Sequence, residues 1–141
     1  MRGLILTLLL TPFALAAPIP KEVKKGMALE GTWEVVEFQM LGQATNAYNG
    51  ALWKIGKDSM DIEYTATSGL TPVTNKRKAI DTTTTPKSLD YTNYMGQDRK
   101  AIFEIDGDKL TLCIPTDPPD RPKELKADET NLFYIFKRVK E

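Results

Sequence analysis

The feature that most constrains the fold is a succession of short segments in which apolar and polar residues alternate, separated by turn residues. In 59–65 the apolar positions are Met60, Ile62 and Tyr64, and the residues between them are polar. This period of two places one face of an extended strand in a core and the other in water. No stretch between these segments has the length and period of an amphipathic helix, so a parallel sheet with helical crossovers is excluded.

Eight such segments are predicted to be strands, and most of them are joined by short turns. They cover residues 32–40, 52–55, 59–65, 73–82, 88–94, 100–105, 109–114 and 132–139. Gly56-Lys57-Asp58 and Asp106-Gly107-Asp108 are typical of hairpin turns. An antiparallel meander removes both of its exposed edges by closing on itself. We therefore predict an all-β fold, an antiparallel eight-stranded up-and-down barrel, with a sandwich of two sheets as the alternative.

Residues 1–16 have the organisation of an export signal peptide. Arg2 supplies a positive charge, residues 4–15 are mostly apolar, and Ala14-Leu15-Ala16 has the small-x-small pattern that signal peptidase recognises. The alternative, a membrane-spanning helix, needs about 20 apolar residues. We expect cleavage near Ala16, export to the periplasm or the extracellular medium, and no membrane span in the mature chain.

Residues 17–28 are predicted to be a tether, because they are rich in proline and lysine. Val23 and Met27 have the spacing of one short helical turn that packs against the domain. The barrel domain is then expected to occupy residues 29–141.

Rare and missing residue types exclude several kinds of chemistry. The chain has no histidine, which removes the usual general base and the commonest metal ligand. Its one cysteine, Cys113, cannot form an internal disulfide, a CxxC pair or a cysteine-based zinc site. Basic and acidic residues number 19 each, so no net charge attracts nucleic acid. We predict a protein that is not an enzyme and has no catalytic residues, metal or cofactor.

Gly31-Thr32-Trp33, at the start of the first predicted strand, resembles the Gly-x-Trp signature of lipocalins and other calycin barrels. The resemblance implies that Trp33 plugs the closed end of the barrel, with a basic residue from the last strand over its indole. Lys137 and Arg138 are the candidates, and Arg138 is preferred because a guanidinium stacks better on an aromatic ring than an ammonium does. The alternative is that Trp33 lines a ligand pocket.

A longer ordered set of segments is similar to the lipocalin-like domain of exported planctomycete proteins. The set comprises Leu29-Glu30-Gly31-Thr32-Trp33, Thr85-Pro86-Lys87-Ser88-Leu89-Asp90, Ile105-Asp106-Gly107-Asp108-Lys109-Leu110-Thr111-Leu112-Cys113, Arg121-Pro122 and Phe136-Lys137-Arg138. The similarity spans most of residues 29–140. That family has no assigned activity, so the resemblance implies the calycin-type fold and leaves the function open.

The barrel interior supplies the candidate ligand-binding residues. Strand alternation predicts that the following side chains face inward: Trp53, Met60, Ile62, Tyr64, Leu110, Leu112 and Ile114. An inward side chain belongs either to a packed core or to a pocket wall, and alternation alone does not separate the two. The hydroxyls of Tyr64, Tyr91 and Tyr94 suit either a ligand or polar partners in the interior.

Two functions are favoured after these exclusions, while a third, an enzyme with a carboxylate or tyrosine acid inside the barrel, has no residue that the sequence singles out. The leading prediction is an exported, non-enzymatic barrel that binds one small apolar or amphipathic ligand, since an eight-stranded barrel has room for one. The alternative is an interaction module with a packed barrel, in which the loop 117–128 binds another exported protein or a cell-surface polymer.

Two other features receive structural interpretations. Cys113 is expected to lie on the face opposite Leu112 and Ile114, packed under the N-terminal segment. The basic cluster Lys76-Arg77-Lys78 is expected to belong to a solvated edge strand, where charges discourage aggregation.

Overall fold

The computed structural model describes residues 28–116 and 120–140, which form nine strands and one short 3-10 turn. The elements are β1 (Gly31–Met40), β2 (Gln43–Thr45), β3 (Leu52–Ile55), β4 (Ser59–Glu63), η2 (Ala66–Ser68), β5 (Val73–Asp81), β6 (Lys87–Thr92), β7 (Asp98–Asp106), β8 (Lys109–Pro115) and β9 (Asn131–Arg138). The predicted signal peptide, the tether up to Met27 with its helical turn, and 117–119 of the predicted binding loop lie outside the described residues.

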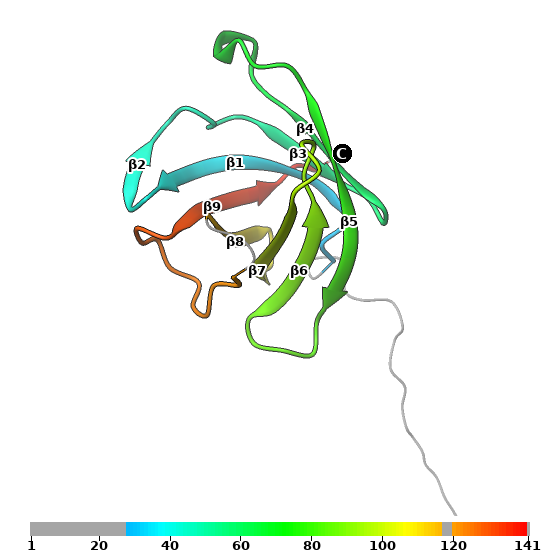
Figure 1. Cartoon of the computed structure of the whole chain (residues 1–141). Coiled ribbons are helices and arrows are strands. Elements are labelled where there is room, and N and C mark those ends of the chain that lie inside the picture. The colour runs from blue at the N-terminus through cyan, green and yellow to red at the C-terminus, as the bar shows by residue number, and fades with distance from the viewer. Residues whose placement is uncertain (1–27, 117–119, 141) are drawn as a thin grey trace, which may run out of the picture.

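Eight of the strands close into a barrel (Figure 1). From β3 to β9 each strand pairs antiparallel with the next, and β1 pairs with both β3 and β9. The β1–β9 register runs from Trp33 opposite Arg138 to Met40 opposite Leu132, so the first and last strands pair along almost their whole length. The predicted antiparallel eight-stranded barrel is confirmed, and the alternative of two separate sheets is wrong.

The short strand β2 is not among the strands predicted from the sequence. Leu41 and Gly42 both have positive φ, 53° and 79°, and they connect Met40 to its pairing partner Gln43. Two positive φ values in a row define the type I′ hairpin turn, which leucine rarely enters. The dipeptide Leu-Gly is therefore no turn signal, and the three exposed residues of β2 have no pattern of burial.

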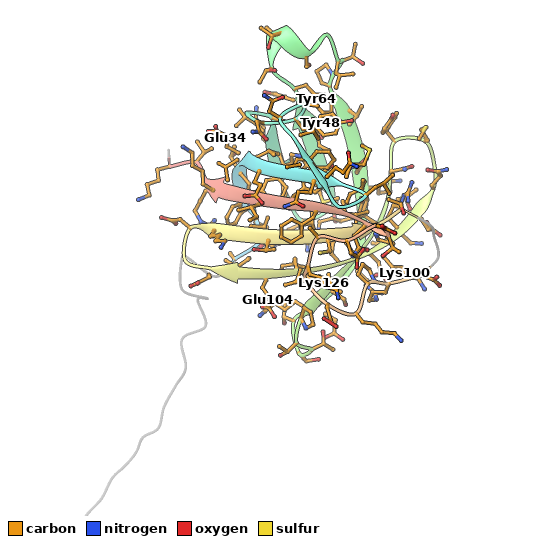
Figure 2. All side chains as sticks on the ribbon, turned by 90° about the vertical axis from the view of Figure 1, so that its left-hand side faces the viewer. Glu34, Tyr48, Tyr64, Lys100, Glu104 and Lys126 are labelled. Carbon is orange, nitrogen blue, oxygen red and sulfur yellow. The ribbon has the colours of Figure 1, made fainter. Side chains whose placement is uncertain are left out.

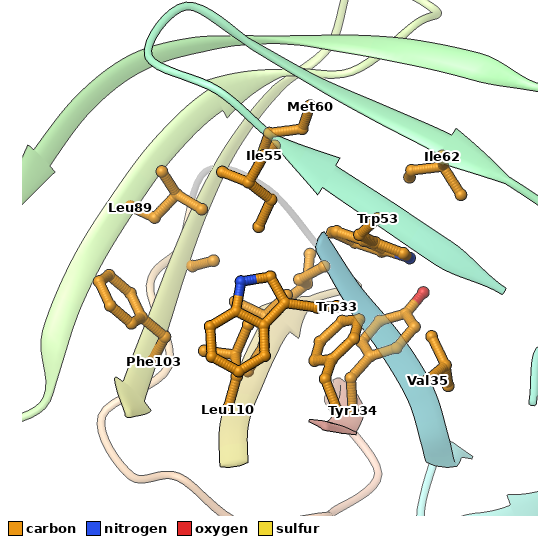
Figure 3. Packing of buried hydrophobic residues seen from close by; sticks show 14 of the residues in the cluster. Trp33, Val35, Trp53, Ile55, Met60, Ile62, Leu89, Phe103, Leu110 and Tyr134 are labelled. Carbon is orange, nitrogen blue, oxygen red and sulfur yellow. The ribbon is translucent and has the colours of Figure 1, made fainter. Parts of the chain in front are cut away.

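The core fills the barrel interior (Figure 3). Side chains at alternate strand positions point inward, as the sequence predicts, except that an irregularity between Val35 and Glu37 shifts the alternation in β1, and the largest inward side chains are completely buried. These are Trp33, Phe38, Phe103, Phe136, Met60, Leu89, Leu110 and Val35. Within the described residues no helix is long and apolar enough to cross a membrane.

A second, smaller packed layer lies outside the barrel, over β7 and β8. Ile102 and Cys113 are opposite one another in these strands and are buried, although neither belongs to the interior cluster. The segment that precedes β9 covers them: Arg121 donates to the carbonyl of Ala101 and to Asp90, and the Cys113 thiol donates to the carbonyl of Lys126. Cys113 is thus covered by this segment, whereas the predicted cover, the N-terminal segment, lies outside the described residues up to Met27.

The basic cluster does not lie in an edge strand, which corrects the sequence interpretation. Strand β5 pairs with β4 on one side and with β6 on the other. Lys76 and Lys78 are exposed, but the side chain of Arg77 is only 9% exposed and pairs with Glu30. The three adjacent cations therefore divide between two faces, because successive side chains of a strand point in opposite directions.

Candidate functional site

One end of the barrel is closed around Trp33. Its side chain is completely buried, and its indole N–H donates to the carbonyl oxygen of Leu29 at 2.9 Å. The guanidinium carbon of Arg138 lies 4.1 Å from the centre of the indole ring, which is a cation–π contact. The other candidate, Lys137, has a side chain that is 62% exposed and lies 4.0 Å from Glu34.

Arginine side chains also fix the segment that enters β1. Arg138 donates to the carbonyl of Ala28 at 3.0 Å, and Arg77 pairs with the carboxylate of Glu30 at 2.7 Å. Burial raises the pKa of Glu30, but the hydrogen bond and charge of Arg77, a backbone hydrogen bond and the charge of Lys57 together outweigh it and hold that pKa below its usual value. The chain just before β1 is therefore held over the end of the barrel at Trp33 and covers it.

A cavity of about 130 Å³ opens toward the opposite end of the barrel. Most of its lining comes from strand ends remote from Trp33 and from the connections that join them, and it also includes Trp53, the pairing partner of Trp33. The lining residues are Tyr48, Trp53, Ile62, Tyr64, Val73, Asn75, Tyr91, Asn93, Tyr94, Arg99, Ile114, Leu132 and Tyr134. The cavity is therefore aromatic and amphipathic, with the charged side chain of Arg99 in its wall.

Aromatic contacts arrange part of this wall. The ring centres of Tyr48 and Tyr64 are 5.7 Å apart, and the two side chains lie close together in Figure 2. Trp53 packs edge-on against Tyr134 at 5.2 Å, and Phe38 lies 4.7 Å from Tyr134 on another side. These contacts hold the rings in place before any ligand arrives.

The phenol hydroxyls of the cavity have no hydrogen-bond partner within the described part of the chain. Tyr91 and Tyr134 are only 4% and 7% exposed as residues, and their hydroxyl oxygens keep contact with the cavity or with solvent. Burial raises the pKa of Tyr91, Tyr134 and Tyr64, so these groups are neutral donors at physiological pH. Water or a ligand in the cavity is the natural partner for these hydroxyls.

The structure separates the seven interior residues predicted from the sequence into two groups. Trp53, Ile62, Tyr64 and Ile114 line the cavity. Met60, Leu110 and Leu112 face inward as well, but they belong to the packed core and not to the cavity wall.

Several wall residues are not among the predicted site residues. Tyr48 precedes β3 in a connection that carries no strand pattern, and Asn93 lies in the turn after β6. Tyr94 is predicted to end the strand 88–94, but it lies beyond Thr92 in that turn and is exposed. Arg99 lies outside the predicted strand 100–105, whereas the observed β7 begins at Asp98. With that start, Arg99 alternates with the inward residues Ala101 and Phe103, and the period of two predicts that it faces inward as well.

The buried thiol of Cys113 is predicted to be unreactive in the folded protein. Burial raises its pKa to about 11, and only the thiolate is an effective nucleophile. We expect alkylation by iodoacetamide at neutral pH to be at least tenfold slower in the folded protein than in urea. Equal rates in the two conditions would contradict the burial of Cys113 beneath the segment before β9.

Comparisons with known proteins assign neither a family nor a function to the chain. No family model matches the chain, and searches of curated proteins and of solved structures find no match. Among the described residues, no three side chains of the metal-binding types histidine, cysteine, aspartate and glutamate are grouped to hold a metal ion. The resemblance to exported planctomycete lipocalin-like domains therefore stays a prediction, and the cavity is the feature from which a function is argued.

Proposed function

We propose that this protein binds one small amphipathic molecule in the cavity at the open end of the barrel, and that it acts as an exported, non-enzymatic carrier or sensor of that molecule. The observation that carries the proposal is a preformed aromatic cavity lined by tyrosines, two of them buried residues, whose hydroxyls are open to the cavity or to solvent and have no protein partner in the described residues. A ligand, or water that a ligand displaces, satisfies these groups.

The size of the cavity limits the ligand to about one ring. A cavity of 130 Å³ is smaller than the roughly 300–1,000 Å³ of most drug-sized pockets. Engineered protein cavities of about 150 Å³ bind benzene. Long acyl chains and polycyclic compounds are therefore poor candidates, and a substituted six-membered ring or a short branched chain is the favoured class.

A panel of one-ring compounds tests the proposal. Phenol, benzamide and benzoate are titrated into the protein by calorimetry, and we expect at least one of them to bind with a stoichiometry near one. Ile62→Phe adds a ring to the cavity wall and is expected to weaken that binding at least tenfold. Val73→Phe, on the neighbouring strand of the same wall, is expected to act in the same way.

Ile80→Phe is the matched control, because Ile80 lies on β5 and is exposed. It makes the same chemical change outside the cavity and should leave the affinity unchanged. Thermal unfolding of each variant shows whether it is folded. The proposal fails if no compound binds saturably, or if folded Ile62→Phe and Val73→Phe bind as well as the unchanged protein.

The interaction-module alternative has one specific consequence. In the described part of the predicted loop, Arg121 is tied to Asp90 at 2.6 Å and to the carbonyl of Ala101. A Gly/Ser replacement of 117–128 would therefore remove barrel contacts as well as loop surface. Binding of a macromolecule that is lost on that replacement, and that Arg121→Ala alone does not impair, would favour this alternative.

A further inference from the structure

We infer that the ligand of this cavity is a small monocarboxylic acid whose carboxylate pairs with Arg99. This inference rests on the proposed function and specifies the chemical class of its ligand. It is carried by the position of Arg99, by the partners that its guanidinium has, and by a cavity wall that contains no acidic side chain among the described residues.

Arg99 is the second residue of β7, and its side chain lines the cavity. Strand alternation places it on the same face as Ala101 and Phe103, which are fully buried in the interior. Its pairing partner in β6 is Tyr91, another wall residue. The guanidinium and the phenol of Tyr91 are therefore neighbours at the open end. Burial raises the pKa of that phenol, and the positive charge of Arg99 partly lowers it.

The hydrogen bonds of Arg99 within the described residues go to neutral groups. One nitrogen donates to the carbonyl of Pro115 and another to the side-chain oxygen of Gln97, each at 3.1 Å. A guanidinium has five N–H donors, so these two bonds fix its orientation and leave donors for a ligand.

Arg99 differs in this respect from every other arginine in the described residues. Arg77, Arg121 and Arg138 each have a carboxylate within 3.5 Å, those of Glu30, Asp90 and Asp108 respectively. Arg99 has no ion pair within residues 28–116 and 120–140.

The nearest acidic residue in sequence, Asp98, does not compensate the charge of Arg99. Its carboxylate accepts from Thr92 at 2.9 Å and pairs with Lys78 at 3.3 Å. It projects from the opposite face of β7, since it is adjacent to Arg99 in the strand. The cavity thus keeps one unbalanced positive charge.

One positive charge matches one negative charge on the ligand. The fork of a guanidinium fits a carboxylate through two parallel hydrogen bonds, and such charged bonds are stronger than neutral ones. Much of the remaining wall is aromatic or aliphatic, with Trp53, Ile62 and Ile114 among its members. A flat or branched apolar body with a single carboxylate therefore satisfies both parts of the cavity.

Benzoate and benzamide provide the test, because they share a ring and a shape and differ in charge. For the unchanged protein we expect calorimetry to give at least tenfold tighter binding of benzoate, in line with the strength of charged hydrogen bonds. Arg99→Gln should reduce the affinity for benzoate to that for benzamide, and should leave the affinity for benzamide within a factor of about three.

Lys100→Gln is the matched control, since Lys100 is the next residue of β7 and is exposed on the outer face (Figure 2). It removes the same charge without changing the cavity and should keep the preference for benzoate. If benzamide binds the unchanged protein as tightly as benzoate, the inference is overturned while the proposed function stands. If neither compound nor phenol binds, both fail. Because the comparison of two ligands needs no variant, it decides the question even where Arg99→Gln folds poorly.

Discussion

Replacing Trp33 by alanine is expected to lower the free energy of unfolding by about 3–5 kcal/mol. The indole is completely buried at the closed end of the barrel, where its N–H donates to the carbonyl of Leu29 at 2.9 Å. The guanidinium of Arg138 also stacks on the indole ring, with its carbon 4.1 Å from the ring centre. Truncation therefore leaves a cavity, a carbonyl without its indole donor and an arginine without its stacking partner.

Urea unfolding followed by circular dichroism measures this change. Val36→Ala is the matched control on the same strand, because Val36 is 41% exposed and should change stability by no more than about 0.5 kcal/mol. A Trp33→Ala protein that loses less than about 1 kcal/mol would show that the indole does not plug the barrel.

Arg138→Ala is the second large effect, with an expected loss of about 2–4 kcal/mol from the cation–π contact and from charged hydrogen bonds. The side chain of Arg138 is 16% exposed, so solvent screens these interactions only weakly. Besides Trp33 it contacts the carbonyl of Ala28 at 3.0 Å and the carboxylate of Asp108 at 3.5 Å. It therefore joins the N-terminal segment, the β7–β8 turn and the end of β9.

Lys137→Ala is the control for this experiment, because both side chains are sequence candidates for the same role. Its exposed pair with Glu34 should contribute no more than about 0.5 kcal/mol. The same urea titration decides between them: if Lys137→Ala destabilises the protein as much as Arg138→Ala, the stacking of Arg138 on Trp33 does not stabilise the barrel.

The barrel could be predicted from the sequence because its determinants are local. The alternation at Met60 and Ile62, and the Asp-Gly turn at Gly107, fix strand faces and hairpins within a few residues. Closure then follows from the need to pair the edges of a meander. Strand β2 escapes prediction because its turn uses Leu41 at positive φ, a conformation that leucine seldom adopts.

The cavity could be predicted only in part, because its shape depends on contacts between distant strands. Alternation identifies Ile62 and Leu112 as inward side chains alike, but of these two Ile62 lines the cavity and Leu112 packs in the core. The division depends on how far each lies from the closed end, and therefore on register around the whole ring. Likewise, nothing local to Arg121 reveals that it crosses to Asp90, 31 positions away, to hold the outer layer over the barrel.

Methyl NMR during a titration with benzoate tests most directly whether the cavity binds a ligand. We expect saturable shifts at the methyl groups of Ile62, Val73 and Ile114, which line the cavity. The methyl groups of Val36 and Ile80, on exposed side chains outside it, should stay in place. An absence of saturable shifts with benzoate, benzamide and phenol alike, or shifts confined to the exposed methyl groups, would contradict binding in the cavity.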